Sequence, residues 1–336
     1  MTTNSSPARR RLTGSVVLIG LAATAAAALA TPPGTNGRIA FRRYSDPAKT
    51  SGAIFTISSD GAGLTQITHP PPGMIDDQPN WASDGKRLVF CRMNGKGSCA
   101  ITVVNADGTG LRRVTRACDL PPKCVDRYQP SFTADDRRIV FTRASGRIKD
   151  AMIQHSAVAT MRPDGRGEHE IYQFPDYAAN VEYAQASPNG RRIAFERANG
   201  PKGPNKFGHA VFVVRIDGSR LRQLTPWKLG AGNGPDWAPD GSRILFRSNE
   251  GLDESHSQLY TVRPDGTQLR QLTDFAAGTN LFKATYSPDG RQIVFGKGDA
   301  EKRGDLWAMN ADGTDQHPIL DAVEWDSAAT WGSAAK

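Results

Sequence analysis

Short runs of consecutive apolar residues recur along the chain, each directly after a polar residue. Six runs share this form: 38–41, 87–90, 138–141, 192–195, 243–246 and 292–295. Apolar residues at consecutive positions predict a strand that is buried on both faces. The pattern therefore predicts several sheets that are each covered by neighbouring sheets.

Each run belongs to a longer repeat, whose clearest copy spans residues 78–115. An Asp-Gly pair precedes the apolar run, and a second pair, Asp107-Gly108, follows the next apolar segment, 101–104. Asp-Gly pairs tolerate the positive φ angles of tight hairpin turns. The last segment of a unit alternates apolar residues with Arg or Gln, as in 221–225 and 269–273, which is typical of an exposed sheet edge. Each unit thus predicts a four-stranded antiparallel sheet.

The second Asp-Gly turn recurs six times, at Asp60, Asp107, Asp164, Asp217, Asp265 and Asp312. The first unit begins at Gly37 without an inner strand, whereas the chain ends with an unpaired inner strand at 327–332. Pairing of the two fragments would close a ring and remove the exposed ends of an open array. We expect an all-β fold, a six-bladed β-propeller closed by its C-terminal strand; an open solenoid is the alternative.

The segments 186–190, 237–241 and 286–290 read Ala-Ser-Pro-Asn-Gly, Trp-Ala-Pro-Asp-Gly and Tyr-Ser-Pro-Asp-Gly. They resemble the repeat signature of TolB-type propellers, and the resemblance covers nearly all of the chain after residue 36. It implies six blades and a role in binding an envelope lipoprotein. We expect the N-terminal α/β domain of TolB to be missing here. Similar repeats occur in oligopeptidase-like enzymes and polysaccharide lyases, so the resemblance indicates fold better than function.

The first thirty residues have the layout of a secretory signal peptide: three arginines at 9–11, an apolar stretch and Ala28-Leu29-Ala30 before Thr31. A retained membrane anchor is the alternative, and the arginines loosely match a twin-arginine signal. We expect a signal peptide at 1–30, a linker at 31–36, the propeller at 37–332 and a tail at 333–336. Without the three arginines the formal net charge falls from +8 to +5, and no basic run interleaved with aromatics favours nucleic-acid binding.

The four cysteines favour an oxidising compartment, because exported thiols tend to pair. Cys91 and Cys99 flank a hairpin connection, and Cys118 and Cys124 close a short loop. We predict these two local disulfides. The spacing does not match the usual zinc sites.

The long connections between strands fall on the face opposite to the Asp-Gly turns, where recognition is expected. Alignment of the inner strands brings polar and aromatic residues to one channel mouth on that face: Asp77, Gln78, Tyr128, Gln129, Glu182, Tyr183, Asn233, Phe282 and Lys283. They are candidates for binding a peptide or a sugar, or else solvated pore residues. The tryptophans of the inner strands are expected to pack between blades.

No Gly-x-Ser-x-Gly elbow, phosphate loop or His-Glu-x-x-His motif is present. His155, His209 and His256 stand near the start of the third strand in successive units and could in principle hold a metal, although blades diverge outwards. We expect no catalytic residues, no metal and no cofactor.

The sequence predicts a non-enzymatic binding scaffold, secreted or in the periplasm or cell envelope, that recognises a protein or an envelope polymer. It is expected to be a monomer that does not bind nucleic acid, with membrane association only through an uncleaved signal segment. The alternative is an extracellular propeller enzyme acting on polysaccharide, by lyase- or hydrolase-like chemistry that could depend on a metal.

Overall fold

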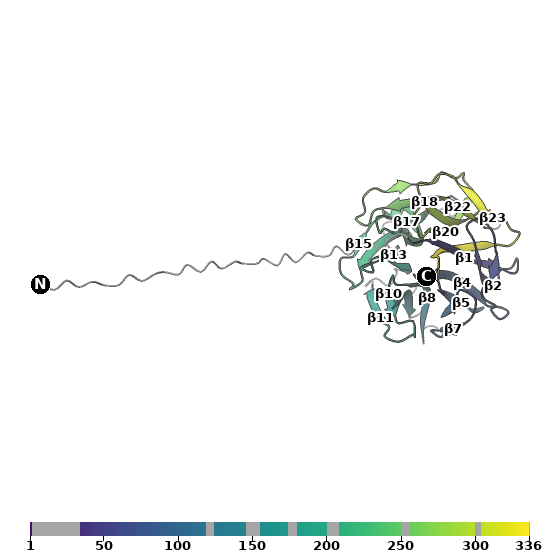
Figure 1. Ribbon diagram of the computed structural model, residues 1–336, viewed down its shortest axis with the longest axis horizontal. Coiled ribbons are helices and arrows are strands. Elements are labelled where there is room, and N and C mark those ends of the chain that lie inside the picture. The colour runs from purple at the N-terminus through teal and green to yellow at the C-terminus, as the bar shows by residue number, and fades with distance from the viewer. Residues whose placement is uncertain are drawn as a thin grey trace.

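The computed structural model describes Met1 and residues 34–118, 124–145, 155–173, 180–199, 208–249, 256–299 and 304–335. These residues form strands arranged around a common centre (Figure 1). The innermost strands are β4 (Ile75–Trp81), β8 (Val125–Phe132), β12 (Val181–Ala186), β16 (Ala231–Trp237), β20 (Thr279–Tyr286) and β24 (Asp326–Ser333). The second strands, which hold the apolar runs, are β1 (Asn36–Tyr44), β5 (Arg87–Met93), β9 (Ile139–Ser145), β13 (Arg192–Ala198), β17 (Ile244–Asn249) and β21 (Gln292–Asp299).

Two outer strands complete each group of four. The third strands are β2 (Gly52–Ile57), β6 (Cys99–Asn105), β10 (His155–Met161), β14 (His209–Arg215), β18 (Ser257–Val262) and β22 (Asp305–Asn310). The fourth strands are β3 (Thr65–Gln66), β7 (Arg112–Arg113), β11 (His169–Gln173), β15 (Arg222–Gln223), β19 (Arg270–Gln271) and β23 (His317–Leu320). One 3₁₀ helix, η1 (Trp227–Leu229), lies between β15 and β16. The chain is therefore nearly all-β, as predicted.

The described strands form four four-stranded sheets and one eight-stranded sheet, where the sequence led us to expect six separate sheets. Neighbouring strands within each group of four are antiparallel. The larger sheet arises because β2 and β4 share a single parallel pair, Gly52 with Ile75. This pair links the group that contains β1 to the group that contains β5.

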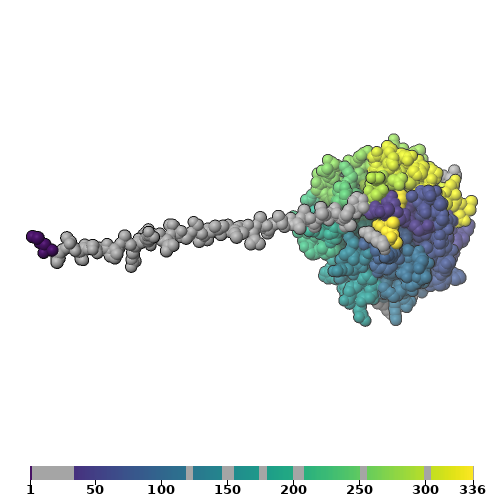
Figure 2. All heavy atoms as spheres, viewed as in Figure 1, coloured from purple at the N-terminus to yellow at the C-terminus, as the bar shows by residue number. Residues whose placement is uncertain are grey.

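The C-terminal strand closes the ring, as predicted. β24 pairs antiparallel with β1, and Trp331 lies opposite Ile39. The Ala334 amide also donates to the Thr35 carbonyl at 2.8 Å. Figure 2 shows the purple beginning of the ring-forming part of the chain and the yellow C-terminal segment side by side near the middle of one face.

A belt of glycine contacts joins neighbouring groups on the Asp-Gly side. At each second turn, a Cβ built on the glycine would meet the backbone of the preceding group's outer segment: Gly61 meets Ile319, Gly108 meets Ile67, Gly165 meets Val114, Gly218 meets Ile171, Gly266 meets Leu224 and Gly313 meets Leu272. The contact of Gly61 with Ile319 joins the beginning and the end of the chain. Glycine serves here for its positive φ and, at every one of these turns except Gly266, for a close backbone approach.

The core lies between adjacent sheets. The last residue of each apolar run is a fully buried phenylalanine: Phe41, Phe90, Phe141, Phe195, Phe246 and Phe295. One core cluster, for example, joins Val89 of β5 to Phe141 of β9. Burial on both faces explains why these strands are apolar at consecutive positions instead of alternate ones.

Both predicted disulfides are present, Cys91 with Cys99 and Cys118 with Cys124, with Cα atoms 5.4 and 5.5 Å apart. The predicted signal peptide at 1–30 lies, except for Met1, outside the described residues. Among the residues that are described, no helix has the length and apolar character needed to cross a membrane.

Candidate functional site

The channel has two mouths, which we name by their connections. The turn-face mouth carries the Asp-Gly turns at the C-terminal ends of the inner strands, and the loop-face mouth lies at their N-terminal ends. Just before the aromatic position of each inner strand stands a polar residue, and these form a polar ring: Asn80, Ser131, Gln185, Asp236, Thr285 and Thr330. Both the candidate residues of the loop face and this ring belong to the same six strands.

Each inner strand is bulged on its loop-face side. The register against the second strand shifts there, for example between Asp77 and Asn80 of β4 and between Glu182 and Gln185 of β12. Non-glycine residues adopt positive φ at several of these bulges: Gln78, Gln129, Tyr183, Asn233 and Ala328. Positive φ is costly for such residues, and bulges re-aim side chains. The bulges therefore turn the predicted mouth residues away from regular strand geometry.

A hydrogen-bonded network crosses the channel axis between the two mouths. Lys283 Nζ of β20 donates to Asn80 Oδ1 of β4 at 2.9 Å and to the Pro79 carbonyl at 3.4 Å. Gln185 Nε2 of β12 donates to the same Asn80 oxygen at 3.3 Å. Burial lowers the pKa of the Lys283 amine to about 8, although the negative charges of Asp236 and Asp77 raise it in part. Lys283, predicted to be a mouth residue, is thus a buried element that ties three inner strands together.

The loop-face mouth holds an acidic cluster of Glu182, Glu196 and His209. Glu196 of β13 is buried, accepts a hydrogen bond from the Asn233 amide at 2.5 Å, and pairs with His209 Nδ1. Burial lowers the pKa of the His209 imidazole, but the hydrogen bond and charge of Glu196 outweigh it, so the pKa is raised. The charge of Glu196 is therefore held by an imidazole and a backbone amide.

Glu182 has no such partner. In the described part of the chain it accepts a hydrogen bond of 3.4 Å from Gln129 Nε2. Burial, followed by the nearby charge of Glu196, raises the pKa of the Glu182 carboxyl to about 7. The charge of His209, which is paired with Glu196, opposes this rise. A partly buried carboxylate without an ion pair of its own is the group in this mouth that would gain most from a further cation.

The remaining predicted mouth residues are engaged within the fold. Arg42 Nη1 lies 2.6 Å from Asp77 Oδ2. Gln129 is buried and accepts hydrogen bonds from the Tyr183 amide and from Thr142 Oγ1. Phe282 packs on Trp325 with ring centroids 5.5 Å apart.

Both tyrosines of the mouth are shielded from water. Burial, and then the charge of Glu182, raises the pKa of Tyr128 and of Tyr183. Gln78 remains partly exposed, with its backbone bulged at φ 55°. Among these candidate residues, Glu182 carries the least compensated charge.

The three histidines that the sequence offered as metal ligands do not assemble a site. His155 Nε2 contacts Glu170 Oε1 at 3.1 Å within its own group of strands, and His209 pairs with Glu196. Over the described ranges, which include His256, no three His, Cys, Asp or Glu side chains are grouped for a metal ion. The reason is geometric, since third strands of neighbouring groups diverge from the axis.

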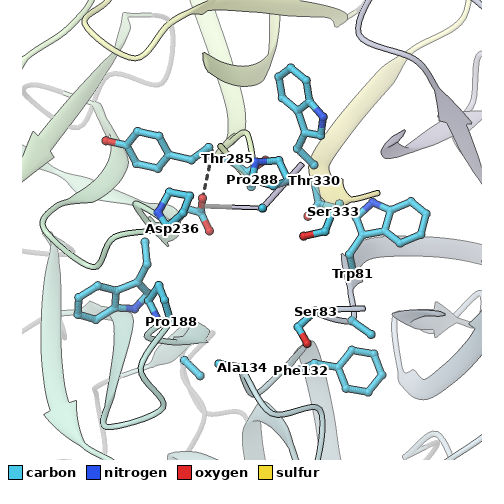
Figure 3. Close-up of a pocket in the computed structure, with 18 of the residues that line it drawn as sticks. Trp81, Ser83, Phe132, Ala134, Pro188, Asp236, Thr285, Pro288, Thr330 and Ser333 are labelled. Atoms are coloured by element: carbon cyan, nitrogen blue, oxygen red, sulfur yellow. Dashed lines mark hydrogen bonds between the residues drawn. The ribbon is translucent and has the colours of Figure 1, made fainter. Parts of the chain in front are cut away.

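The turn-face mouth contains a cavity of about 290 Å³. Figure 3 shows that the rings of Trp81 and Phe132 extend away from the opening, whereas the Asp236 carboxylate faces it. Trp237 and Trp331 are 6% exposed and belong to core clusters. The tryptophans of the inner strands thus pack between groups of strands, as predicted, and they also border the cavity together with smaller residues.

Sequence reasoning missed this cavity and the polar ring beneath it. The available signal was the polar residue before every aromatic position of the inner strands, as in Asp236-Trp237 and Thr285-Tyr286. Successive side chains of a strand point to opposite faces of the sheet. Because the residue at the aromatic position is packed between sheets, the polar residue before it faces the channel.

Comparisons with known proteins support the fold. No family model matches the chain. Dipeptidyl-peptidase 5 of Porphyromonas gingivalis is 35% identical over 147 residues, which cover 44% of this chain and 21% of that protein. The chain therefore spans about a fifth of this curated relative.

Two solved structures extend the comparison. TolB from Acinetobacter baumannii superposes with a TM-score of 0.66 at 16% identity, covering 88% of this chain and 66% of TolB. Kuenenia stuttgartiensis hydrazine synthase gives a TM-score of 0.68 at 17% identity, covering 90% of this chain and 47% of that chain. At such identities the likeness concerns architecture alone. The chain has the β-propeller fold of TolB-type proteins.

Proposed function

We propose that this protein is a binding scaffold outside the cytoplasm, and that its loop-face mouth receives a positively charged side chain of a partner protein. The observation that carries the proposal is Glu182, a partly buried carboxylate next to the buried Glu196. Among the described residues it has no ion pair of its own, since the nearby His209 is paired with Glu196. A lysine or arginine from a partner would supply the missing charge in a site of reduced dielectric constant.

The surroundings of Glu182 favour a long, thin cationic side chain. Tyr183 and Tyr128 are close enough for their pKa values to respond to the Glu182 charge, so aromatic surface lies beside the carboxylate. A lysine or arginine stem can pack on such surface while its charged end reaches the acid. Parts of the long connections that would surround this mouth lie outside the described residues.

Two further points belong to the proposal. We count six blades, because the eight-stranded sheet divides at the single pair of Gly52 with Ile75 into two groups of four, and six glycine contacts run around the ring. We place the protein in the periplasm or outside the cell, because two disulfides persist best in an oxidising compartment.

The proposal is tested by the binding of fluorescent oligolysine and oligoglutamate peptides, measured by anisotropy in 150 mM salt. We expect saturable binding of the lysine peptide and at least a tenfold weaker affinity for Glu182→Gln. Because cation binding requires the ionised carboxylate, and the Glu182 pKa is about 7, the affinity should fall between pH 8 and pH 6.

The control variant is Asp315→Asn, which removes a carboxylate whose side chain is 69% exposed. It should bind as tightly as the unaltered protein. Equal loss in both variants, or a preference for oligoglutamate, would reject the site. The same variants should then be used in affinity capture from an envelope extract to identify the partner.

A second candidate function is glycan cleavage, which the proximity of Glu182 to Glu196 favours. Glycosidases use two carboxyl groups, of which the acid has a raised pKa. Reducing-end release from a panel of polysaccharides decides between the candidates. Release that is abolished by both Glu182→Gln and Glu196→Gln supports the enzyme, whereas no release by the unaltered protein supports the scaffold.

A further inference from the structure

The cavity at the turn-face mouth is separate from the acidic cluster, because the cross-axis network of Lys283, Asn80 and Gln185 lies between them. Its volume of about 290 Å³ lies near the lower end of the range found for small-molecule sites. All of its lining residues are described, and they come from the ends of the inner strands and the turns that follow (Figure 3).

The cavity and its immediate surroundings carry no net charge, which indicates an uncharged ligand. Asp236 is the only charged side chain among the lining residues. Lys283 lies behind the wall and opposes the rise in the Asp236 pKa, which burial brings to about 6. With one acid in the wall and one amine behind it, the site carries no net charge, and neither an anion nor a cation would be strongly favoured.

The floor of the cavity offers hydrogen bonds that the fold does not use. Asp236 accepts the Tyr286 amide at 2.8 Å through Oδ2 and also interacts with the Trp237 amide. Its carboxylate borders the cavity, where a ligand hydroxyl can donate to a remaining lone pair. Thr330 and Ser333 also line the floor and rim. Thr285 Oγ1 is buried without a hydrogen-bond partner in the described chain, and rotation of its side chain would turn the hydroxyl to a ligand.

The rim has two chemically different sides. Pro188, Pro239 and Pro288 occupy equivalent positions on three successive strand groups, and Ser83, Ala134 and Ser333 occupy the same positions on the other three. One side therefore presents apolar ring surface, and the other presents small residues that leave room (Figure 3). A ligand that fits both sides has an apolar C–H face and several hydroxyl groups.

We propose that the turn-face cavity is a binding site for an uncharged sugar unit, either free or at the end of a glycan chain. The prolines contact its C–H face, and Asp236, Thr285 and Thr330 bind its hydroxyl groups. The Asp236 carboxylate accepts a hydrogen bond from one ligand hydroxyl, and the two threonine hydroxyls beside it orient the sugar. This site does not depend on the loop-face proposal.

The test is saturation-transfer NMR and calorimetry of the full chain with glucose, galactose and N-acetylglucosamine, and with glucuronate and glucosamine as charged comparators. We expect saturable binding of at least one neutral sugar that exceeds binding of either charged comparator. Binding should weaken at least tenfold in Ala134→Trp, because the indole fills the cavity from the rim without touching Asp236.

Three controls keep the outcome interpretable. Ala62→Trp adds the same side chain at an exposed position of the turn face outside the cavity lining and should bind normally. Asp236→Asn retains the shape and should weaken binding, and Glu182→Gln should leave it unchanged. Binding of only the charged sugars, no saturation with any of the five, or normal binding by Ala134→Trp would overturn the proposal.

Discussion

The two mouths of the channel are built by the same six strands and yet differ in chemistry. The loop-face mouth has bulged backbone, buried ion pairs and the partly compensated acids Glu182 and Glu196. The cavity of the turn-face mouth is lined by prolines, small residues and aromatic side chains, with Asp236 as the one charged side chain of its lining. The difference follows from what comes next in the chain at each end.

At the turn face, every inner strand runs directly into a tight turn whose side chains are used for hydrogen bonds within the turn. Asp240 Oδ1, for example, accepts the Ser242 amide at 2.9 Å, and Asp289 Oδ1 accepts the Arg291 amide at 3.0 Å. Such Asx turns restrict which residues can stand at the rim. The loop-face ends carry no such demand, so side chains there are free to differ between units. The repeat thus fixes one mouth and leaves the other open to specialisation.

The largest expected effect comes from breaking the closure that both mouths share. Trp331→Ala removes a buried ring that packs with Ile39 and Phe41 and whose Nε1 donates to the Gly37 carbonyl at 3.1 Å. We expect a loss of about 3–5 kcal/mol in the free energy of unfolding. Val323→Ala, at a side chain that is 72% exposed, is the control for urea denaturation. An unchanged midpoint for Trp331→Ala would show that β24 does not hold the ring.

Replacement of Lys283, which lies between the two mouths, should have the next largest effect on the free energy of unfolding. Lys283→Met removes the hydrogen bonds to Asn80 and the Pro79 carbonyl and leaves Asp236 without its compensating charge. We expect about 2 kcal/mol of destabilisation, the size found for hydrogen bonds to charged groups. Lys297→Met, on β21, is the matched control, because the Lys297 amine lies over the Trp307 ring and not on the axis. Equal unfolding midpoints of the two variants would contradict the role of the network.

The two mouths should also separate in their pH dependence. Burial raises the pKa of Glu182 to about 7 and that of Asp236 to about 6, above the values expected in the unfolded chain. Folding therefore favours the protonated acids, so this stabilisation is complete below about pH 4 and is lost as the pH rises through 6 and 7. The expected decrease in unfolding free energy between pH 5 and pH 7.5 is on the order of 1–2 kcal/mol.

Urea titrations at pH 5.0, 6.0 and 7.5 measure this decrease. Glu182→Gln should flatten the change between pH 6.0 and 7.5, and Asp236→Asn should reduce the change between pH 5.0 and 6.0, where Glu182 contributes as well. A stability that increases with pH over this interval would mean that the acids of neither mouth are shielded as described.

The smallest effect compares turns on the two faces. Gly108 has φ 85°, and a Cβ there would lie 2.9 Å from the Ile67 carbonyl oxygen, whereas Gly97 has φ 77° and open space around it. Gly97→Ala should cost about 1 kcal/mol through backbone strain alone. Gly108→Ala should cost more, because the adjacent sheet must also shift. Thermal unfolding of the two variants measures the difference, and equal costs would mean that the glycine belt does not fix the spacing of the sheets.

The inner strands show why the sequence predicted only part of the site. Alignment on the aromatic positions placed Glu182 and Lys283 in the channel, because strand periodicity is local. It could not reveal that Lys283 reaches across the axis to Asn80, 203 positions away in the sequence. Nor could it reveal the bulges, since Gln129 and Tyr183 adopt positive φ without the glycine or asparagine that would signal it.

The sequence alone determined the repeating unit, the strands, the turns, the ring closure and both disulfides, because each depends on contacts that are near in sequence or on a pattern that recurs. Only the tertiary structure decided which charges are compensated. Arg42 reaches Asp77 and His209 pairs with Glu196, while Glu182 forms no ion pair of its own among the described residues, and the space between the turns becomes a cavity. These outcomes depend on distances between strands that are brought together only when the ring closes.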